Sequence, residues 1–142
     1  MQIVPYSEKY RDDMIFMVLQ AKDALGRIPR LNEDLLDVPT NYPDRFWLAV
    51  DGGRVVGCVG YTPIADTDEA FLHRLFVKCS MKRRGIGTAL LETAECNMRR
   101  AGIRVSRIHL GEPREQWHES YSFYPKHGYR EYAPRYMSKN LY

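Results

Sequence analysis

The segment Lys82–Thr88 combines basic side chains with two glycines immediately before a helical apolar pattern. The first turn of a helix leaves backbone N–H groups unpaired at the positive end of the helix dipole, and both features attract phosphate. Gly85 and Gly87 carry no side chain that would hold a ligand away from the backbone, while Arg83 and Arg84 add positive charge. The segment therefore predicts a binding site for a phosphate-bearing ligand.

Two familiar phosphate-binding designs do not fit this segment. A Walker A loop requires glycine, four residues and then Gly-Lys-Ser/Thr, and no such string occurs. The dinucleotide fingerprint requires a third glycine where Leu90 stands. The stretch His73–Leu91 instead resembles the central motif of the GNAT superfamily of N-acetyltransferases, in which Gln/Arg-x-x-Gly-x-Gly/Ala follows a strand. Lys82 occupies the Gln/Arg position and keeps its charge, and Cys79 stands where many members have proline.

The resemblance implies that acetyl-CoA is the cosubstrate and that the loop amides hold its pyrophosphate. It also implies that pantetheine lies between the strand Leu75–Val77 and the strand around Ser106–Leu110, with a backbone N–H of Leu75–Val77 stabilising the oxyanion. The cofactor-binding residues expected on this basis are Leu75, Phe76, Val77, Lys82, Arg83, Arg84, Gly85, Ile86, Gly87 and Thr88.

A second motif, Phe123–Tyr129, resembles the family's Phe-Tyr-x-x-x-Gly-Phe segment. In many members the tyrosine equivalent to Tyr124 protonates the departing thiolate, so Tyr124 is expected to be catalytic, with packing as the alternative role. Trp117 and Ser120 stand where relatives often have asparagine and alanine. Pro125 cannot donate a backbone hydrogen bond, which predicts that the helix ends at Tyr124.

Acetyl transfer to an alkylamine also needs a proton acceptor, because such an amine has a pKa of about 10 and is mostly protonated at neutral pH. Glu69 is the expected base, since it lies on the strand that leads into the loop, where the family often places this carboxylate. His73 shares a strand face with Phe71 and Leu75, which favours a packing role. The candidates considered are Glu69, His73, His109, Glu112 and Glu119.

Hydrophobic periodicity predicts the elements that position these residues. Strands are expected near Ile3–Val4, Phe46–Val50, Val55–Tyr61, Glu69–Val77, Val105–Leu110, Tyr129–Tyr132 and Tyr136–Leu141, and helices over Ser7–Leu25, Ile86–Ala101 and around Arg114–Tyr124. The proline-punctuated stretch Arg27–Asp44 is expected to be a loop with a short helical piece at Asn32–Asp37. The resemblance implies a single GNAT domain over residues 1–142, an α/β fold whose central, mixed and mostly antiparallel sheet is splayed and flanked by helices.

Composition narrows the functional classes. The 142 residues carry 21 basic and 18 acidic side chains, and this small excess gives nucleic acid little support as a partner. Three scattered cysteines fit a reducing compartment, and no metal-binding pattern occurs. No stretch approaches the ~20 apolar residues that cross a bilayer, and Met1–Tyr6 lacks a signal-peptide pattern, so a cytoplasmic protein is expected.

The expected activity is transfer of an acetyl group from acetyl-CoA to a primary amine of a small molecule or peptide, by direct attack in a ternary complex. Two alternatives remain: a non-catalytic acyl-CoA-binding module of the same fold, and a nucleic-acid-binding protein that uses Arg83, Arg84, Arg99, Arg100 and Arg104. The sequence does not identify the acceptor amine, whose pocket is expected to be formed by Gly26–Arg45 and the C-terminal strands. A homodimer is a hypothesis by analogy with relatives.

Overall fold

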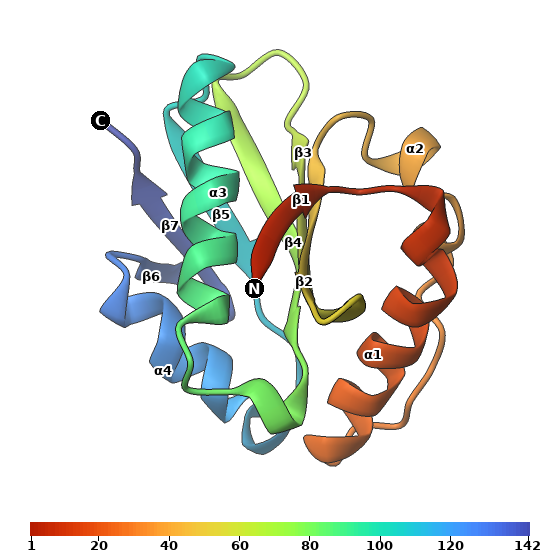
Figure 1. Ribbon diagram of the computed structural model, residues 1–142. Coiled ribbons are helices and arrows are strands. Elements are labelled where there is room, and N and C mark those ends of the chain that lie inside the picture. The colour runs from red at the N-terminus through yellow and green to blue at the C-terminus, as the bar shows by residue number, and fades with distance from the viewer.

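Seven strands form one mixed sheet in the computed structural model, which describes residues 1–142 (Figure 1). The strands are β1 (Gln2–Pro5), β2 (Phe46–Asp51), β3 (Arg54–Pro63), β4 (Glu69–Val77), β5 (Val105–His109), β6 (Arg130–Ala133) and β7 (Tyr136–Asn140). They lie in the order β1-β2-β3-β4-β5-β7-β6, and only the β4–β5 pair is parallel. The predicted mixed, mostly antiparallel sheet is confirmed.

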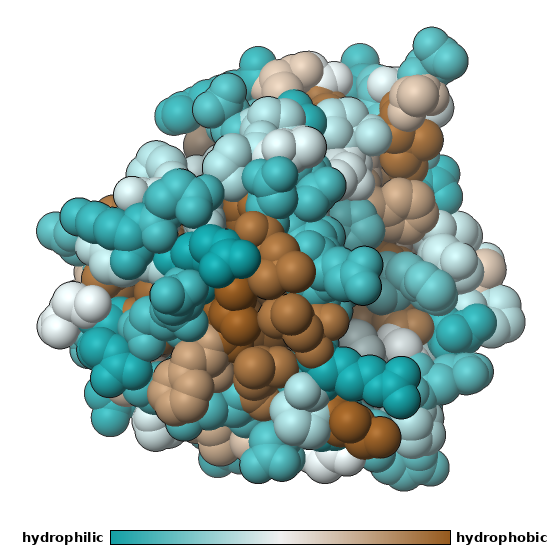
Figure 2. Space-filling view, turned by 90° about the vertical axis from the view of Figure 1, so that its right-hand side faces the viewer, coloured by the Kyte–Doolittle hydropathy of each residue, from teal (hydrophilic) through white to brown (hydrophobic).

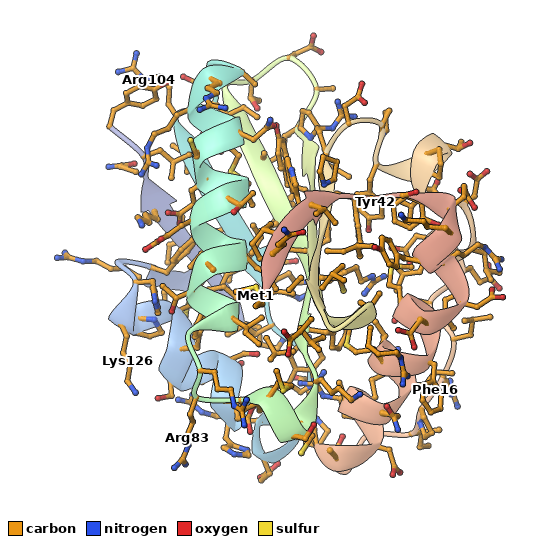
Figure 3. The ribbon with its side chains drawn as sticks, in the orientation of Figure 1. Met1, Phe16, Tyr42, Arg83, Arg104 and Lys126 are labelled. Atoms are coloured by element: carbon orange, nitrogen blue, oxygen red, sulfur yellow. The ribbon has the colours of Figure 1, made fainter.

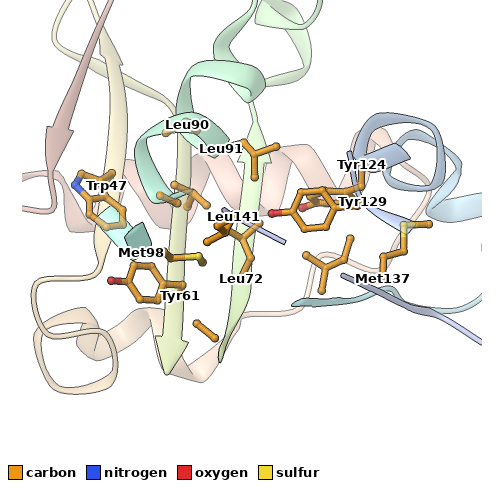
Figure 4. Packing of buried hydrophobic residues seen from close by; sticks show 14 of the residues in the cluster. Trp47, Tyr61, Leu72, Leu90, Leu91, Met98, Tyr124, Tyr129, Met137 and Leu141 are labelled. Atoms are coloured by element: carbon orange, nitrogen blue, oxygen red, sulfur yellow. The ribbon is translucent and has the colours of Figure 1, made fainter. Parts of the chain in front are cut away.

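Helices cover both faces of the sheet, as Figure 1 shows with the sheet between α1 and α3. The α-helices are α1 (Arg11–Ala24), α2 (Val38–Asn41), α3 (Ile86–Arg100) and α4 (His118–Lys126), and short 3₁₀ turns are η1 (Glu8–Tyr10), η2 (Glu33–Asp37), η3 (Cys79–Met81) and η4 (Arg114–Gln116). A cluster of 10 buried residues fills the space beneath α1 and α2. A larger cluster of 19 lies beneath α3 and α4 (Figure 4). None of the helices combines the length and apolar character needed to cross a membrane.

The outer side of α1 and the segment that follows it are also partly apolar. Phe16, Ile28, Leu31 and Leu36 are exposed there. Figure 2 views this side of the molecule and shows hydrophobic residues gathered in its middle. Helix α1 therefore has apolar residues on both its inner and outer sides, which weakens the periodic pattern that marks its buried face.

The sheet opens into a gap between β4 and β5. Pairing between these strands runs only from Glu69–Val105 to Phe71–Arg107, although β4 continues to Val77. Beyond that point β4 keeps its pairing with β3, while β5 stays paired with β7. The expected splay is therefore present, and its open end faces the loop between β4 and α3.

A bulge in β4 lies beside this gap. The register with β3 shifts between the pairs Cys58–Phe76 and Gly60–His73, and Arg74 has a positive φ of 58°. An extra residue in one strand reverses the alternation of its side chains between the two faces of the sheet. Ala70 and Leu72 belong to the cluster beneath α3 before the bulge, and Leu75 packs against the same cluster after it.

The prediction that Pro125 ends the last helix at Tyr124 is wrong, because α4 continues to Lys126 with Pro125 inside it. In a final turn the missing N–H of proline removes one helical hydrogen bond, and the fixed φ of proline suits a helix. His127 and Gly128 then donate their N–H groups to the carbonyls of Tyr124 and Pro125 and close the helix. The predicted helix over Ser7–Leu25 is divided into η1 and α1.

Candidate active site

The loop between η3 and α3 presents unpaired amide groups. None of the backbone N–H groups of residues 83–88 donates a hydrogen bond within the protein, and α3 has no side-chain cap. Arg83 and Gly85 both have positive φ, of 65° and 80°. Figure 3 shows Arg83 at this end of α3, where its side chain and that of Arg84 are exposed. The loop offers an anion several N–H donors together with nearby positive charge.

The two glycines of the loop differ in whether the local structure requires a residue without a side chain. Gly85 is the residue before α3 and adopts the left-handed conformation, which strains any residue with a Cβ atom. Gly87 lies in the first turn, where an added Cβ would stand 3.4 Å from Cε1 of Phe123 on α4. Gly85 therefore shapes the loop, whereas the packing around Gly87 would accept a Cβ atom in ordinary van der Waals contact.

Lys82 forms an ion pair with Glu119 of α4. The pair joins the loop after β4 to the helix that follows β5, so it crosses the open end of the gap. The sequence predicted Lys82 as a ligand of phosphate, and the structure adds an acidic partner that phosphate would have to replace. Glu119, one of the candidate bases, is occupied by the same contact.

Tyr124 is buried on α4 with 7% of its surface exposed. Its ring packs against Phe123 and Tyr129, at centroid distances of 5.2 Å and 5.3 Å, and Figure 4 shows it beside Tyr129 in the larger cluster, to which Leu72 and Met137 also belong. Its hydroxyl makes no hydrogen bond within the protein, and burial raises the pKa of Tyr124. Tyr124 thus combines a packed ring with a protonated hydroxyl that is free to donate.

Glu69, the expected base, lies in the part of β4 that is still paired with β5. Its carboxylate accepts a hydrogen bond of 2.5 Å from Nε of Arg107, which in turn lies over the ring of Tyr132. Glu69 precedes His73 by four positions along the strand, or about 13 Å. The structure therefore does not bring Glu69 to the open part of the gap.

His73 lies at the start of that open part. Its Nε2 is 3.0 Å from Oγ1 of Thr62 on β3. The rings of Tyr42 and Phe71 flank the imidazole at centroid distances of 6.2 Å and 6.1 Å. Burial lowers the pKa of His73, and the positive charge of Arg74 lowers it further. The packing role expected for His73 is present, together with one hydrogen bond.

An ionic cluster that sequence reasoning missed anchors the segment after α1 to the bulge. Asp34 of η2 accepts two hydrogen bonds of 2.9 Å from Arg74 and one from the hydroxyl of Tyr42. Burial acts to raise the pKa of Asp34, but these bonds outweigh it and lower the pKa. The thiol of Cys58 donates to the carbonyl of Arg74 at 3.1 Å. The bulge is therefore stabilised through both the side chain and the backbone carbonyl of Arg74. No motif or residue spacing in the sequence predicts these contacts.

The remaining candidates have other contacts. His109 is exposed and stacks on Tyr136 with centroids 4.3 Å apart. Glu112 pairs with Arg135 at 3.5 Å. No group of three or more His, Cys, Asp or Glu side chains is arranged to hold a metal ion.

A second contact crosses the open end of the gap on the α1 side. Trp117 lies directly on Gly111, where any Cβ would collide with the indole at 2.2 Å. The guanidinium of Arg27 stands 3.6 Å from the centre of that indole and donates to the carbonyl of Gln116. The end of α1 is thereby joined to the segment after β5. Trp117, which departs from the family pattern, has a packing role here.

This geometry is that of a splayed sheet with a phosphate-type loop at its open end, and the comparison with known families agrees with it. The profile of the acetyltransferase (GNAT) domain matches residues 43–131. The chain belongs to this family. Among known proteins, the probable N-acetyltransferase camello of Xenopus tropicalis is 36% identical over 80 residues, which is 53% of this chain. The chain spans only 36% of that relative's length.

Solved GNAT structures share the whole fold. An acetyltransferase of the GNAT family from Staphylococcus aureus has a TM-score of 0.88 at 22% identity, over 99% of both chains. The PaiA N-acetyltransferase of Thermoplasma acidophilum, in complex with coenzyme A, has a TM-score of 0.78 at 20% identity, over 98% of both chains. A GNAT family acetyltransferase from Brucella melitensis, in complex with acetyl-CoA, has a TM-score of 0.73 at 17% identity, over 98% of this chain and 86% of its own. The fold of this chain is the GNAT fold.

Proposed function

We propose that this GNAT protein is an N-acetyltransferase that moves an acetyl group from acetyl-CoA to a primary amine of a small molecule or peptide, by direct attack in a ternary complex. The observation that carries the proposal is the row of unpaired N–H groups at residues 83–88, placed at the open end of the gap between β4 and β5. Family membership and the ligand-bound relatives support it.

The cofactor-binding residues proposed are those that the sequence indicated. The amides of residues 83–88 and the charges of Lys82, Arg83 and Arg84 would hold the pyrophosphate, and the edge of β4 at Leu75–Val77 would face the thioester. Acetyl-CoA supplies an activated acyl group. The residues of the chain would bind acetyl-CoA, align its carbonyl, remove a proton from the amine and donate one to the sulfur.

Tyr124 is proposed to donate its hydroxyl proton to the sulfur as the thioester bond breaks. A thiol has an ordinary pKa of about 8.5, so a phenol of raised pKa is still protonated at every pH at which the enzyme would work. Because the hydroxyl of Tyr124 makes no hydrogen bond within the protein, none has to break before it donates its proton. The single-domain organisation, the cytoplasmic location and the homodimer remain predictions.

Isothermal titration with acetyl-CoA and with CoA tests the cofactor site. Wild-type protein should bind both with micromolar or lower Kd, and the double variant Gly85→Val with Gly87→Val should bind at least about tenfold more weakly. Gly102→Val is the matched control, since Gly102 has the same φ of 80° as Gly85 and the same open surroundings at the other end of α3. A folded wild type that binds neither ligand would remove the basis of the proposal.

Replacing Glu119 should strengthen the binding of CoA. In Glu119→Gln the ammonium of Lys82 no longer has a carboxylate partner and is free for phosphate, so we expect an affinity gain of about threefold to tenfold at low salt. Glu115→Gln makes the same change of net charge on η4, at an exposed residue that forms no ion pair, and should change the Kd less than about twofold. Equal effects of the two variants would show that only overall charge matters.

A further inference from the structure

His73 stands where the sheet begins to open. The last pair between β4 and β5 is Phe71–Arg107, and His73 is paired only on its other side, with Gly60 of β3. Arg74, the next residue, has the positive φ of the bulge, and Leu75–Val77 follow as the proposed oxyanion donors. His73 is therefore at the narrow end of the gap, next to the strand segment that would face the thioester.

The side chain of His73 lies on the face of the sheet opposite the cofactor loop. Its neighbour Leu72 is buried in the cluster beneath α3, and side chains alternate between faces along a strand. His73 contacts Tyr42, which belongs to the cluster beneath α1. The pyrophosphate loop begins α3 on the other face. An acceptor that meets a thioester within the gap must come from the face that the cofactor does not occupy, and this is the face of His73.

The imidazole is held in one orientation and keeps one nitrogen free. Nε2 contacts the hydroxyl of Thr62, whereas Nδ1 makes no hydrogen bond within the protein. If Nε2–H donates to the hydroxyl, Nδ1 carries the lone pair that a base needs. The charged groups that face the ring are Arg74 and Asp34, which are bonded to each other, and the hydroxyl of Tyr42 is bonded to Asp34. Burial and Arg74 lower the pKa of His73, which favours the neutral ring.

The competing bases have other contacts. The carboxylates of Glu69, Glu112 and Glu119 are each paired with a cation. His109 lies on the last residue of β5 and is stacked on Tyr136. We infer that His73 is the general base of the proposed acetyl transfer, taking a proton from the amine that attacks the thioester. This inference rests on the proposed function and assigns to His73 the role that the family resemblance gave to Glu69.

The proton balance is complete with the residues at hand. The acceptor enters as a neutral amine, and its nitrogen forms the new C–N bond while Nδ1 of His73 takes one proton from it. The C–S bond breaks, and the hydroxyl of Tyr124 gives its proton to the sulfur. Transfer of one proton through solvent from the imidazolium to the tyrosinate restores both groups. The products are the amide and the free thiol of CoA.

The test compares pH profiles of CoA release, with phenethylamine, spermidine and a lysine-containing peptide as acceptor probes. Activity of the wild type should rise with pH through an apparent pKa below 6.5, the ordinary value for histidine. His73→Gln should lose about 100-fold at pH 7 and lose this rising limb, with the Kd of acetyl-CoA changed less than about twofold. Glu69→Gln, the control, should keep the limb and stay within about threefold of the wild-type rate.

A His73→Gln variant that keeps both its rate and its rising limb would overturn the inference, as would a Glu69→Gln variant that loses them. A second readout needs no acceptor: the imidazole signals of His73, assigned by their loss in His73→Gln, should titrate below 6.5 and report the Nε2–H tautomer. The Nδ1–H tautomer would also overturn it, because Nδ1 would then have no lone pair to take the proton. A wild type that binds acetyl-CoA but releases no CoA with any probe would contradict the proposed transfer, and the tautomer of His73 then decides on His73 alone.

Discussion

Tyr124→Phe should lower kcat for CoA release by at least about 100-fold and leave the affinity for acetyl-CoA unchanged. The substitution removes one oxygen from a ring that stays packed against Phe123 and Tyr129. Because the hydroxyl makes no hydrogen bond in the protein, its loss leaves no buried group without a partner. Protonation of a leaving group by a positioned acid accelerates a reaction by about 10²–10⁴-fold, and that is the contribution removed.

The measurement is steady-state CoA release alongside titration with acetyl-CoA, and two other tyrosines serve as controls. Tyr121→Phe changes a half-buried residue of the same helix and should be close to wild type in both assays. Tyr129→Phe removes a hydroxyl that bonds Glu95 and Ser106, so it should lower the melting temperature. Full turnover in Tyr124→Phe would leave Tyr124 as a packing residue. A wild type that binds acetyl-CoA and never turns over would favour the acyl-CoA-binding module.

The unit from β4 to α3 could be predicted from sequence because its signals are local. Apolar residues change from a strand pattern to helical spacing on either side of the two glycines, and the observed limits of β4, Glu69–Val77, are those predicted. The start of α3 at Ile86 also agrees. The unpaired amides of the loop follow directly from a helix whose preceding residue, Gly85, has no side chain to accept their hydrogen bonds.

The partners of the site residues could not be predicted, because they are distant in sequence. Arg107 lies on a different strand from Glu69, and Glu119 on a different helix from the loop of Lys82. The bulge at Arg74, with its positive φ, was not predicted either, and neither was the ion pair of Arg74 with Asp34 of the predicted short helical piece Asn32–Asp37. Residue type therefore placed both candidate bases on β4, and only tertiary contacts distinguish His73, the proposed base, from Glu69.

The sheet can open between β4 and β5 only if its two parts stay joined at the closed end of the gap. A buried polar network around Glu95 joins them. Glu95 of α3 is 3% exposed. Its carboxylate accepts a hydrogen bond of 2.8 Å from Tyr129, ahead of β6, and pairs with Lys139 of β7 at 2.9 Å. Helix α3 packs on β2, β3 and β4, so these bonds join the half that carries the cofactor loop to the half formed by β5, β7 and β6.

Lys139→Met should therefore destabilise the protein by about 2–3 kcal/mol, or lower its Tm by about 8 °C, because Glu95 would lose its closest cation while staying buried. The partial exposure of Lys139 places the loss below that of a fully buried pair. Lys126→Met, at an exposed lysine of α4 without an ion pair, should stay within about 0.5 kcal/mol of wild type. Adding Glu95→Gln to Lys139→Met removes the buried charge, whose remaining cation would be Arg99 at 4.0 Å, and should restore much of the loss. Thermal unfolding of these variants tests whether the Glu95–Lys139 pair stabilises the contact between the two parts of the sheet. If Lys139→Met is as stable as Lys126→Met, apolar packing alone holds the two parts together.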